Sequence, residues 1–521
     1  MALGTAEAGK GPKTKNRHRF YSLSSSSAFN LWRTPAKLLP AMPTFHIEQF
    51  GCRATQADGA AIERQLLDRG CSPAASAFDA DVIVLNTCTV TAAADAQARE
   101  AIRKIHAAKP TTPIIVTGCY AQRAPEDLAT LPGVSHVVGN SHKPQIPNLI
   151  SSPIPNSSPN FVPLNPLKNA ATLFVVGAQH VAPFVRTSSL STAVATLPAP
   201  ILIGDIFDNT EVLVAPVLGG EGQHTRPTLK IQDGCNNRCS FCVIPFVRGK
   251  SRSLPPESVV QEIRNLVNSG NKEIVLSGIN LGAWGRDLSP GHDFLDLLRQ
   301  ILDETSVERL RLSSIEPLDV TRDLVTLFAF SPRLAEHFHM PLQSASDRIL
   351  AAMHRWYRSE HYARRIDFIR EQLPHAAIGA DVITGFPGET EADHDATLNF
   401  IESRPFSYLH VFSYSLRPGT RAASLSNQVP TPTKKRRARE LRALSEKKSA
   451  EFRHSQSGRV LSVLTLRHSD STETTEWTPA LSSNFLKLRL AGVWPSNQFV
   501  NAACSSSTDE ISLPELPPLL T

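Results

Sequence analysis

Three cysteines stand close together in one short run of the chain, DGCNNRCSFC. They are Cys235, Cys239 and Cys242. Electron-transfer [4Fe–4S] clusters use four thiolates, so three would leave one iron open to a cofactor or substrate. A structural zinc ion is the alternative, but it needs a fourth ligand, and no Cys or His follows within twenty residues of Cys242. The run therefore predicts a [4Fe–4S] cluster with an open position.

A second group of three cysteines is spread along the N-terminal part of the chain. Cys52, Cys88 and Cys119 each follow a strand-like run, in HIEQFGC, VIVLNTC and IIVTGC. Ligands bind beyond the carboxyl ends of parallel strands, so these thiols should converge on one crevice. Three unrelated buried cysteines are the alternative. Cys71 and Cys504 do not follow such strands and are expected to be plain buried thiols.

The composition is that of a globular protein with several domains. The 521 residues are 41% hydrophobic and 20% charged, and the net charge of +6 is compatible with a polyanionic partner. No apolar run approaches the ~18 residues of a membrane span, so we expect no membrane segment. Residues 1–42 are basic and Ser-rich, which predicts a disordered extension or a misassigned start, with a transit peptide as the alternative. Clustered cysteines without a secretory signal indicate reduced, metal-binding thiols in the cytoplasm.

Strands alternate with helices in two parts of the chain. In residues 43–147, apolar runs such as DVIVLN and PIIVT predict buried parallel strands of a doubly wound α/β domain. Residues 203–432 hold six further strand–helix units, which predict an open (βα)6 partial barrel. The expected barrel strands are Leu229–Gln232, Glu273–Ser277, Leu310–Ser313, His337–Leu342, Ile378–Ile383 and Leu409–Tyr414. Residues 148–202 are rich in Ser, Pro and Asn and are expected to form an insertion or linker.

The Cys235–Cys242 run resembles the signature of the radical S-adenosylmethionine (SAM) superfamily. The resemblance implies that the open iron chelates SAM, which is cleaved to a 5′-deoxyadenosyl radical. Phe241 fits the aromatic position beside adenine, although it could equally be core packing. Polar and glycine residues at the barrel strand ends are candidates for holding SAM, or else helix caps. They are Gly278, Asn280, Ser314, Glu316, Gln343, Asp381 and Gly385. Arg248 and Arg252 could neutralise a cofactor carboxylate or RNA phosphate, or lie solvated at the surface.

The C-terminal part of the chain is expected to bind RNA. Residues 433–456 predict a basic helix with one apolar face, whose candidate RNA contacts are Lys434, Lys435, Arg436, Arg437 and Arg439; a solvated helix is the alternative. Residues 457–514 resemble the TRAM domain, a small all-β RNA-binding barrel, although WTPALSSNFLKL departs from the usual form. Phe485 could stack on an unpaired base or belong to the barrel core.

The order of these parts resembles the methylthiotransferase family. The resemblance covers residues 43–147 and 203–500, in motifs such as FGCRATQAD, NTCTVTAAAD, TGCYAQR, IQDGCNNRCSFCVIPFVRG, HMPLQSASD and DVITGFPGET. It implies that Cys52, Cys88 and Cys119 bind an auxiliary [4Fe–4S] cluster, that all six cysteines are catalytic, and that SAM is both radical source and methyl donor. The implied partners are tRNA, an electron donor such as flavodoxin or ferredoxin, and a sulfur source.

Within this family, NTCTVTAAAD with Thr91 and Asp95 resembles the threonylcarbamoyladenosine branch. That branch implies methylthiolation at C2 of N6-threonylcarbamoyladenosine next to the tRNA anticodon. Methylthiotransferases for isopentenyladenosine tRNA or for a ribosomal protein are the alternatives, and the latter usually carry Cys-Pro where this chain has Arg53 after its first cysteine. A non-catalytic iron–sulfur RNA-binding module is the rival of another class. The threonylcarbamoyl carboxylate requires donors in its pocket, and the candidates that flank the cysteines are Arg53, Thr55, Gln56, Thr89 and Thr91.

Overall fold

The computed structural model describes residues 42–151, 198–209, 212–213, 215–216, 225–467, 476–507 and 511–512. The expected extension at residues 1–42 therefore lies outside the described residues, apart from Met42. The expected linker at residues 148–202 begins inside helix α5 and ends with a strand of the N-terminal sheet; its residues 152–197 also lie outside the described part. Among the described residues, no helix is both long and apolar enough to span a bilayer.

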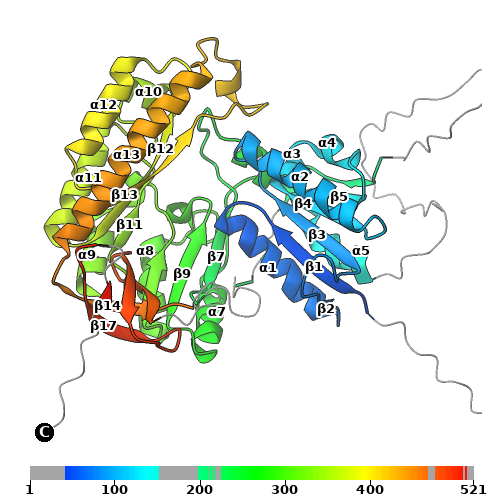
Figure 1. The fold of residues 1–521 in the computed structure, drawn as a ribbon, viewed down its shortest axis with the longest axis horizontal. Helices are drawn as coiled ribbons and strands as arrows, with labels where there is room; N and C mark the ends of the chain where they lie inside the picture. Colours follow the sequence, from blue (N-terminus) through cyan, green and yellow to red (C-terminus); the bar gives the residue numbers. More distant parts are fainter. Residues whose placement is uncertain are drawn as a thin grey trace, which may run out of the picture. The chain divides into compact units, whose positions relative to one another are not determined.

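The N-terminal part is the doubly wound α/β domain that the sequence predicts. Its parallel sheet has the strand order β2-β1-β3-β4-β5-β6. The strands are β1 (Thr44–Gln49), β2 (Ser72–Pro73), β3 (Val82–Thr87), β4 (Ile114–Gly118), β5 (Val134–Val138) and β6 (Ile201–Leu202). Helices α1 (Arg53–Leu67) and α5 (Ile146–Ser151) cover one face. Helices α2 (Ala92–Ala108), α3 (Cys119–Arg123) and α4 (Pro125–Ala129) cover the other (Figure 1).

The central part has the six parallel strands of the predicted open barrel. They are β7 (Thr228–Asp233), β9 (Glu273–Gly278), β10 (Arg309–Leu312), β11 (His337–His339), β12 (Ala377–Thr384) and β13 (Tyr408–Ser413). The strands form the parallel arrays β7-β9-β10 and β11-β12-β13, and the short antiparallel β8 (Arg252–Ser253) extends the first. Strand β11 ends earlier than predicted, three residues before Leu342, because Pro341 has no amide hydrogen to donate to a neighbouring strand.

Helices follow the barrel strands and bury one face of each. They are α6 (Ile244–Arg248), α7 (Pro256–Asn268), α8 (Phe294–Glu304), α9 (Arg322–Phe330), α10 (Asp347–Ala352), α11 (Ser359–Gln372), α12 (Glu391–Glu402) and α13 (Thr431–Ser455). Alternate strand residues such as Leu229, Leu310 and Ile378 pack with these helices in the main core. The side chains between them, such as Lys230, Arg311 and His337, are buried yet polar. Because side chains alternate along a strand, the second face of the barrel sheet is lined with charged and hydrogen-bonding groups.

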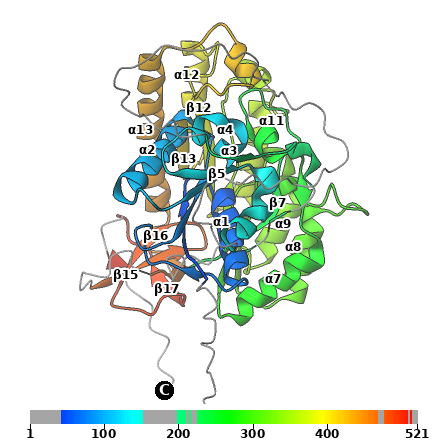
Figure 2. The same cartoon turned by 90° about the vertical axis from the view of Figure 1, so that its right-hand side faces the viewer.

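The C-terminal part is a small, mainly antiparallel β-sheet in the order β17-β14-β15-β16-β18, as the all-β prediction requires. Its strands are β14 (Val460–Thr465), β15 (Trp477–Ser482), β16 (Lys487–Ala491), β17 (Phe499–Ala503) and β18 (Ile511–Ser512). The sheet follows the end of α13 (Figure 2). Its core contains Val463, Leu488 and Leu490.

One buried carboxylate attaches this sheet to the barrel. The Glu273 carboxylate accepts hydrogen bonds from Arg311 Nε at 2.7 Å, Arg226 Nη1 at 3.2 Å and Arg309 Nη1 at 3.4 Å. Arg311 and Arg309 also donate to backbone carbonyls of the C-terminal sheet, including that of Ser482 at 3.0 Å. Burial alone would raise the pKa of Glu273, but the surrounding guanidinium groups hold it at about 2.

The first prediction concerns this carboxylate. We expect Glu273→Gln to lower the free energy of unfolding by about 3 kcal/mol at neutral pH, because buried guanidinium groups lose their counter-charge. The folded pKa of about 2 lies below the ordinary 4.5, so this stabilisation is complete above pH 4.5 and is lost as the pH falls toward 2. Urea unfolding of wild type and variant at neutral pH and near pH 3 measures the difference, which should shrink in acid.

Glu308→Gln is the matched control, because that carboxylate is 52% exposed and lies 3.7 Å from Lys272. It should change the free energy of unfolding by less than about 1 kcal/mol. Equal losses in the two variants would contradict the role assigned to Glu273.

Candidate active site

The loop with the first cysteine group lies between β7 and α6, at the carboxyl end of the barrel strand. The amide of Cys235 donates to the Gly249 carbonyl at 3.1 Å, and the amide of Cys242 donates to the Cys239 carbonyl at 3.1 Å. Ser240 anchors the loop to the end of α10 through its hydroxyl, which donates to the Ala352 carbonyl at 2.8 Å. The sequence between the cysteines therefore holds all three thiols on one turn.

The three thiols are close enough to influence one another. Burial raises the pKa of the Cys242 thiol to about 12, and Cys239 and Cys235 oppose its ionisation further. Burial also raises the pKa of Cys235. Iron ions deprotonate thiols that coordinate them, so a group of buried, mutually repelling thiols fits a metal cluster better than free thiolates.

Side chains from distant parts of the barrel surround this loop. Arg355 Nη1 donates to Cys239 Sγ at 3.2 Å, and its other nitrogen binds Glu316. Asn280 Nδ2 lies 4.0 Å from Cys235 Sγ. Glu316 and Asn280 were predicted for cofactor binding and do lie at the loop, whereas Arg355 was missed. Hydrogen bonds to cluster sulfurs shift the reduction potential, so Arg355 is placed to tune a cluster here.

Gln232 is a second residue that the sequence analysis missed. Its amide nitrogen donates to the carbonyls of Asp233 at 3.0 Å and Gly234 at 2.8 Å, and its oxygen accepts from the Asn280 amide at 2.8 Å. Gly234 adopts a φ of +69°, and a Cβ there would lie 1.9 Å from the Lys250 carbonyl oxygen. Gln232 and Gly234 thus set the path of the chain into Cys235, and their only signal in the sequence is their place just before it.

The second cysteine group also converges. Cys52 precedes α1, Cys88 follows β3 and Cys119 begins α3. A hydrogen bond between Cys52 and Cys88 lowers the pKa of Cys52 and raises that of Cys88, which Cys119 raises further. Gly51 has a φ of +111°, and a Cβ there would lie 2.8 Å from Cys88 Sγ, so only glycine fits beside the thiols. The convergence at the carboxyl ends agrees with the sequence argument.

The two remaining cysteines behave as the expected controls. Cys71 is buried in the core between α1 and the N-terminal sheet, and Cys504 is buried in the core of the C-terminal sheet. Neither belongs to one of the two groups.

A cavity of about 240 Å³ lies between the N-terminal domain and the barrel. The loop after Cys88 contributes Val90 and Thr91, and the radical-SAM-like loop contributes Phe241 and Cys242. The rest of the lining is barrel residues: Val243, Ile244, Gln343, Asp381, Ile383, Phe412, Ser413, Tyr414, Ser415 and Arg417. The cavity therefore joins a member of one cysteine group with the loop that follows a member of the other.

The candidate SAM contacts divide between this cavity and its surroundings. Phe241, Gln343 and Asp381 line the cavity. Ser314 is half-buried outside the lining. Gly278 lies against Gln232, where a Cβ would be 3.0 Å from the amide oxygen. Gly385 lies at the turn after β12, where its amide donates to a Glu389 carboxylate oxygen at 2.7 Å.

A chain of hydrogen bonds runs from the barrel interior to the cavity wall. The Tyr408 hydroxyl lies 2.7 Å from His337 Nε2 and 2.9 Å from His339 Nδ1, and His339 Nε2 lies 3.0 Å from Asp381 Oδ1. His410 Nδ1 is 3.3 Å from the same oxygen. Burial would raise the pKa of Asp381, but hydrogen bonds from His339 and His410 hold it below its ordinary range. The ligand atoms of His339, Asp381 and His410 lie within 4.8 Å of one another, a spacing that could also hold a metal ion.

The NTCTVTAAAD segment has a clear structural role. The Thr89 hydroxyl donates to Asp95 Oδ1 at 2.7 Å, and Asp95 Oδ2 accepts from Arg123 at 2.9 Å and from Arg417 of the barrel at 2.7 Å. Thr91 caps α2 by accepting from an amide at 3.2 Å, and it also lines the cavity. Thr89 is therefore not a free donor for a substrate, whereas Thr91 faces the space where one would lie.

Two of the predicted RNA contacts on α13 are paired with acids. Arg437 is buried and donates to Glu389 at 2.7 Å and to Glu391 at 2.8 Å. Arg436 also donates to Glu391, at 2.7 Å. These arginines fasten α13 to the start of α12, so a phosphate would have to compete with carboxylates for them.

The other candidate RNA contacts differ in their availability. Lys435 and Arg439 are exposed on α13, whereas Lys434 places its ammonium 5.0 Å from the centre of an aromatic ring. Phe485 is half-buried and stacks on His337 with ring centres 4.3 Å apart. The exposed pair remains available to a polyanion, and at least one face of Phe485 is covered by the barrel.

The comparisons with known proteins agree with this geometry. Residues 44–139 match the uncharacterized protein family UPF0004, and residues 229–401 match the radical SAM superfamily. The threonylcarbamoyladenosine tRNA methylthiotransferase MtaB of Aquifex aeolicus is 36% identical over 80% of this chain and 92% of its own. MtaB of Bacillus subtilis is 34% identical over 87% and 91%. This chain belongs to the methylthiotransferase family of radical SAM enzymes, in the MtaB branch.

Relatives of another branch are also similar to this methylthiotransferase. The tRNA-2-methylthio-N(6)-dimethylallyladenosine synthase of Syntrophobacter fumaroxidans is 34% identical over 82% of this chain and 86% of its own. Among solved structures, the radical SAM methyltransferase TsrM from Kitasatospora setae aligns with a TM-score of 0.49 and 15% identity, over 73% of this chain and 77% of that one.

The family implies SAM and [4Fe–4S] clusters as cofactors, and both cysteine groups fit them. Each group brings three thiols together at strand carboxyl ends, with the nearby donors Arg355 and Asn140; Asn140 Nδ2 lies 3.5 Å from Cys119 Sγ. A fourth cysteine joins neither group among the described residues, because Cys71 and Cys504 are buried elsewhere. Each group therefore suits a cluster with one open iron.

The second prediction tests these ligands. Anaerobic reconstitution should load about eight irons per chain, and Cys239→Ala and Cys88→Ala should each lose about four, since each removes one ligand of one cluster. Iron and acid-labile sulfide analysis measures the loading. Cys71→Ala, a change at a buried thiol outside both groups, is the control and should keep all of the iron. Loss of iron in the control, or full loading in Cys88→Ala, would contradict the assignment.

Proposed function

We propose that this enzyme is a tRNA methylthiotransferase that places a methylthio group at C2 of N6-threonylcarbamoyladenosine next to the anticodon. The observation that carries the proposal is a cavity that joins Cys242 of one three-cysteine group with the loop that follows Cys88 of the other. In the proposed reaction, the C–H bond at C2 is broken and C2 forms a bond to a sulfur that bears a methyl group. This C–H bond is too weakly acidic for general-base chemistry, which is why a radical cofactor is needed.

Under this proposal, the residues of the chain divide the work. Cys235, Cys239 and Cys242 hold the cluster that binds SAM, and that bound pair supplies the hydrogen-abstracting radical. Cys52, Cys88 and Cys119 hold the auxiliary cluster, beside which sulfur transfer takes place. Arg355 and Asn280 contact the first cysteine loop, and Glu316 holds Arg355 in place.

The cavity walls position the reactants. Phe241, beside Cys242, offers a flat apolar surface for the adenine of SAM, and Asp381 offers a carboxylate at the cavity wall. Thr91 also lines the cavity, on the loop that leads away from Cys88. The apolar lining excludes water from a radical intermediate, which would otherwise be open to side reactions.

Arg53 supports the threonylcarbamoyl assignment. It directly follows Cys52, and its guanidinium makes no hydrogen bond or ion pair with the residues that the structure describes. Burial lowers the pKa of Arg53, and the nearby cations Arg226 and Arg311 lower it further, against the opposite effect of Tyr408 and of the Glu273 carboxylate that these arginines share. A half-buried cation among other cations attracts an anion. Threonylcarbamoyl carries a carboxylate that could pair with it, whereas dimethylallyl is pure hydrocarbon.

The remaining pocket candidates carry less weight. Thr55 is buried, and its hydroxyl lies 3.5 Å from Cys52 Sγ. Gln56 is half-buried on the first turns of α1. Arg53 and Thr91 are thus the two candidates best placed to meet a polar substituent.

The tRNA would be held partly by the exposed cations of α13. Lys435 and Arg439 are the available members of that group, and phosphate contacts supply much of the affinity for nucleic acids. The reaction also requires an electron donor, such as flavodoxin or ferredoxin, and a sulfur source. A tRNA substrate places the enzyme in the cytoplasm under this proposal.

The third prediction tests the substrate. Offered two tRNAs that carry either threonylcarbamoyl or dimethylallyl adenosine, the enzyme should modify the first far better, as nucleoside mass spectrometry would show. Arg53→Met should lower the rate with the threonylcarbamoyl tRNA by about 10- to 100-fold, the value of one lost charged hydrogen bond. It should leave the low rate with the dimethylallyl tRNA unchanged.

Arg69→Met, at an exposed arginine just beyond the other end of α1, is the matched control and should keep the wild-type rates. Preference for the dimethylallyl tRNA would overturn the substrate assignment. An equal loss on both tRNAs in Arg53→Met would show that this residue does not recognise the carboxylate.

A further inference from the structure

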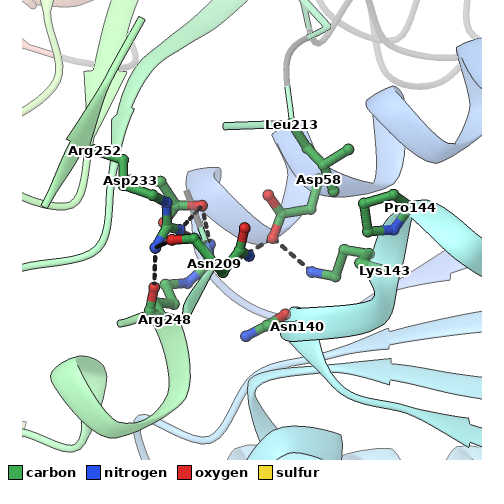
Figure 3. Close-up of a pocket in the computed structure, with 9 residues that line it drawn as sticks. All are labelled: Asp58, Asn140, Lys143, Pro144, Asn209, Leu213, Asp233, Arg248 and Arg252. Carbon is green, nitrogen blue, oxygen red and sulfur yellow. Dashed lines mark hydrogen bonds and ion pairs between the residues drawn. The ribbon is translucent and has the colours of Figure 1, made fainter. Parts of the chain in front are cut away.

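Six charged side chains form a buried ion cluster near the second cysteine group. Figure 3 draws all of them except Lys230. They come from α1, the turn η1 (Asn140–Gln145), β7, α6 and β8, and therefore from both the N-terminal domain and the barrel. The members are Asp58, Lys143, Lys230, Asp233, Arg248 and Arg252. Each of these side chains is at most 9% exposed.

Asp58, on α1 of the N-terminal domain, forms ion pairs with cations of both the N-terminal domain and the barrel. Its carboxylate accepts from Lys143 Nζ at 2.7 Å and from Arg248 Nη2 at 2.9 Å, and it also binds Lys230. Asp233 repeats the pattern on the barrel side. It accepts from Lys230 at 3.0 Å and from Arg248 at 3.0 Å.

The charges of the ion cluster do not balance. Among the residues that the structure describes, four cations of this cluster face two carboxylates, an excess of two positive charges in a buried place. Asp287 is a further carboxylate that acts on Arg252, but it is exposed to solvent and is held by Ser253 at 2.6 and 2.8 Å. An uncompensated buried charge costs several kcal/mol, so the fold is expected to supply an anion at this place.

The position of that anion is indicated by the neighbouring groups. Asp233 and Asp58 hold the pKa of Arg248 above its ordinary value despite burial, and the nearby thiols of Cys119 and Cys52 raise it further. Asn140 connects the two places, because its Nδ2 lies 3.5 Å from Cys119 Sγ and 2.7 Å from the Val247 carbonyl oxygen. The excess positive charge therefore adjoins the second cysteine group.

Two buried hydrogen-bond donors without acceptors also indicate that an anion is missing from this place. The Nε atoms of Arg248 and Arg252 are buried and have no hydrogen-bond partner among the described residues. Both arginines line a cavity of about 20 Å³, together with Asn140 and Lys143 (Figure 3). Buried donors without acceptors are rare in proteins. The cluster is thus an electropositive place that its own carboxylates do not satisfy.

An iron–sulfur cluster has the charge that this place lacks. An oxidised [4Fe–4S] core carries two positive charges, so three thiolates leave it with a single negative charge. An anionic sulfur ligand on its open iron, such as hydrosulfide or methanethiolate, brings the total to two negative charges. That total equals the excess of the ion cluster, and the net charge of a cluster and its surroundings sets its potential.

We propose that the buried ion cluster is the counter-charge of the auxiliary [4Fe–4S] cluster and stabilises the form with an anionic sulfur ligand on the open iron. This inference rests on the proposed function, which assigns Cys52, Cys88 and Cys119 to that cluster. The six side chains are positioning residues, since they act on the cluster through space. Because they come from both the N-terminal domain and the barrel, binding of the sulfur ligand to the open iron depends on the contact between these two parts.

The test uses the full chain with Cys239→Ala, so that only the auxiliary cluster remains. Asp58→Asn raises the excess charge to three, and Lys143→Met lowers it to one, with little change in side-chain size. EPR-monitored redox titration should show a higher midpoint potential in Asp58→Asn and a lower one in Lys143→Met. We expect a change of about tenfold in the reduction equilibrium in each direction, which is 59 mV for one electron.

Hydrosulfide binding gives an independent readout. Titration of hydrosulfide, followed by the change in the EPR spectrum, should show about tenfold tighter binding in Asp58→Asn and tenfold weaker binding in Lys143→Met. Lys143→Arg keeps the charge and should keep the wild-type value of both quantities. If Asp58→Asn does not fold, the comparison of Lys143→Met with Lys143→Arg still tests the role of the charge. Iron analysis and thermal unfolding confirm that each variant is loaded and folded.

The outcomes separate this inference from the proposed function. A Cys239→Ala chain that binds no iron would contradict the auxiliary cluster itself. A chain that binds about four irons, but whose potentials shift in the same direction or not at all in the two variants, would overturn the counter-charge role alone.

Discussion

The guanidinium of Arg248 joins two carboxylates that lead to the two cysteine groups. Asp58 lies on α1, the helix that begins immediately after Cys52, and Asp233 precedes Cys235 by two residues. Both ion pairs are buried, so solvent and salt screen them little. A shift of either partner would leave a buried charge uncompensated, and this cost fixes the position of the two cysteine groups relative to each other.

A second buried contact also joins the N-terminal domain to the barrel, at the larger cavity, which Arg417 lines. Arg417 of the barrel donates to Asp95 at 2.7 Å and to the Thr89 carbonyl at 3.2 Å, beside Cys88. Together with Arg248, it holds the N-terminal domain on the barrel at two places. Fixed contacts between the two parts suit a reaction in which two reactive centres must meet at one carbon atom.

The fold was predictable from the sequence wherever local patterns determine it. Continuous apolar runs predicted β3 and β4, and their cysteines followed from the rule that ligands gather at strand carboxyl ends. The order of strands and helices predicted the open barrel. Strand β11 is shorter than predicted, because Pro341 has no amide hydrogen and cannot continue the hydrogen bonding of the strand.

The residues that the sequence did not reveal are those that act over long distances in the chain. Arg355 contacts Cys239 across 116 positions, and Arg417 contacts Asp95 across 322. Such pairs leave no periodic trace. The resemblance of NTCTVTAAAD to one family branch placed Thr89 in a substrate pocket, yet its hydroxyl is bonded to Asp95. Arg248 and Arg252 were expected to meet a cofactor or phosphate or to lie solvated, and both are buried in ion pairs.

The central claim is that two clusters with different roles share one cavity. The most direct measurement compares 5′-deoxyadenosine release with methylthio product formation in Cys88→Ala, with reductant, SAM and tRNA supplied. The account predicts continued release of 5′-deoxyadenosine and no methylthio product, because the cysteine group that binds SAM is intact. A Cys88→Ala enzyme that still forms the methylthio product at the wild-type rate would contradict the account.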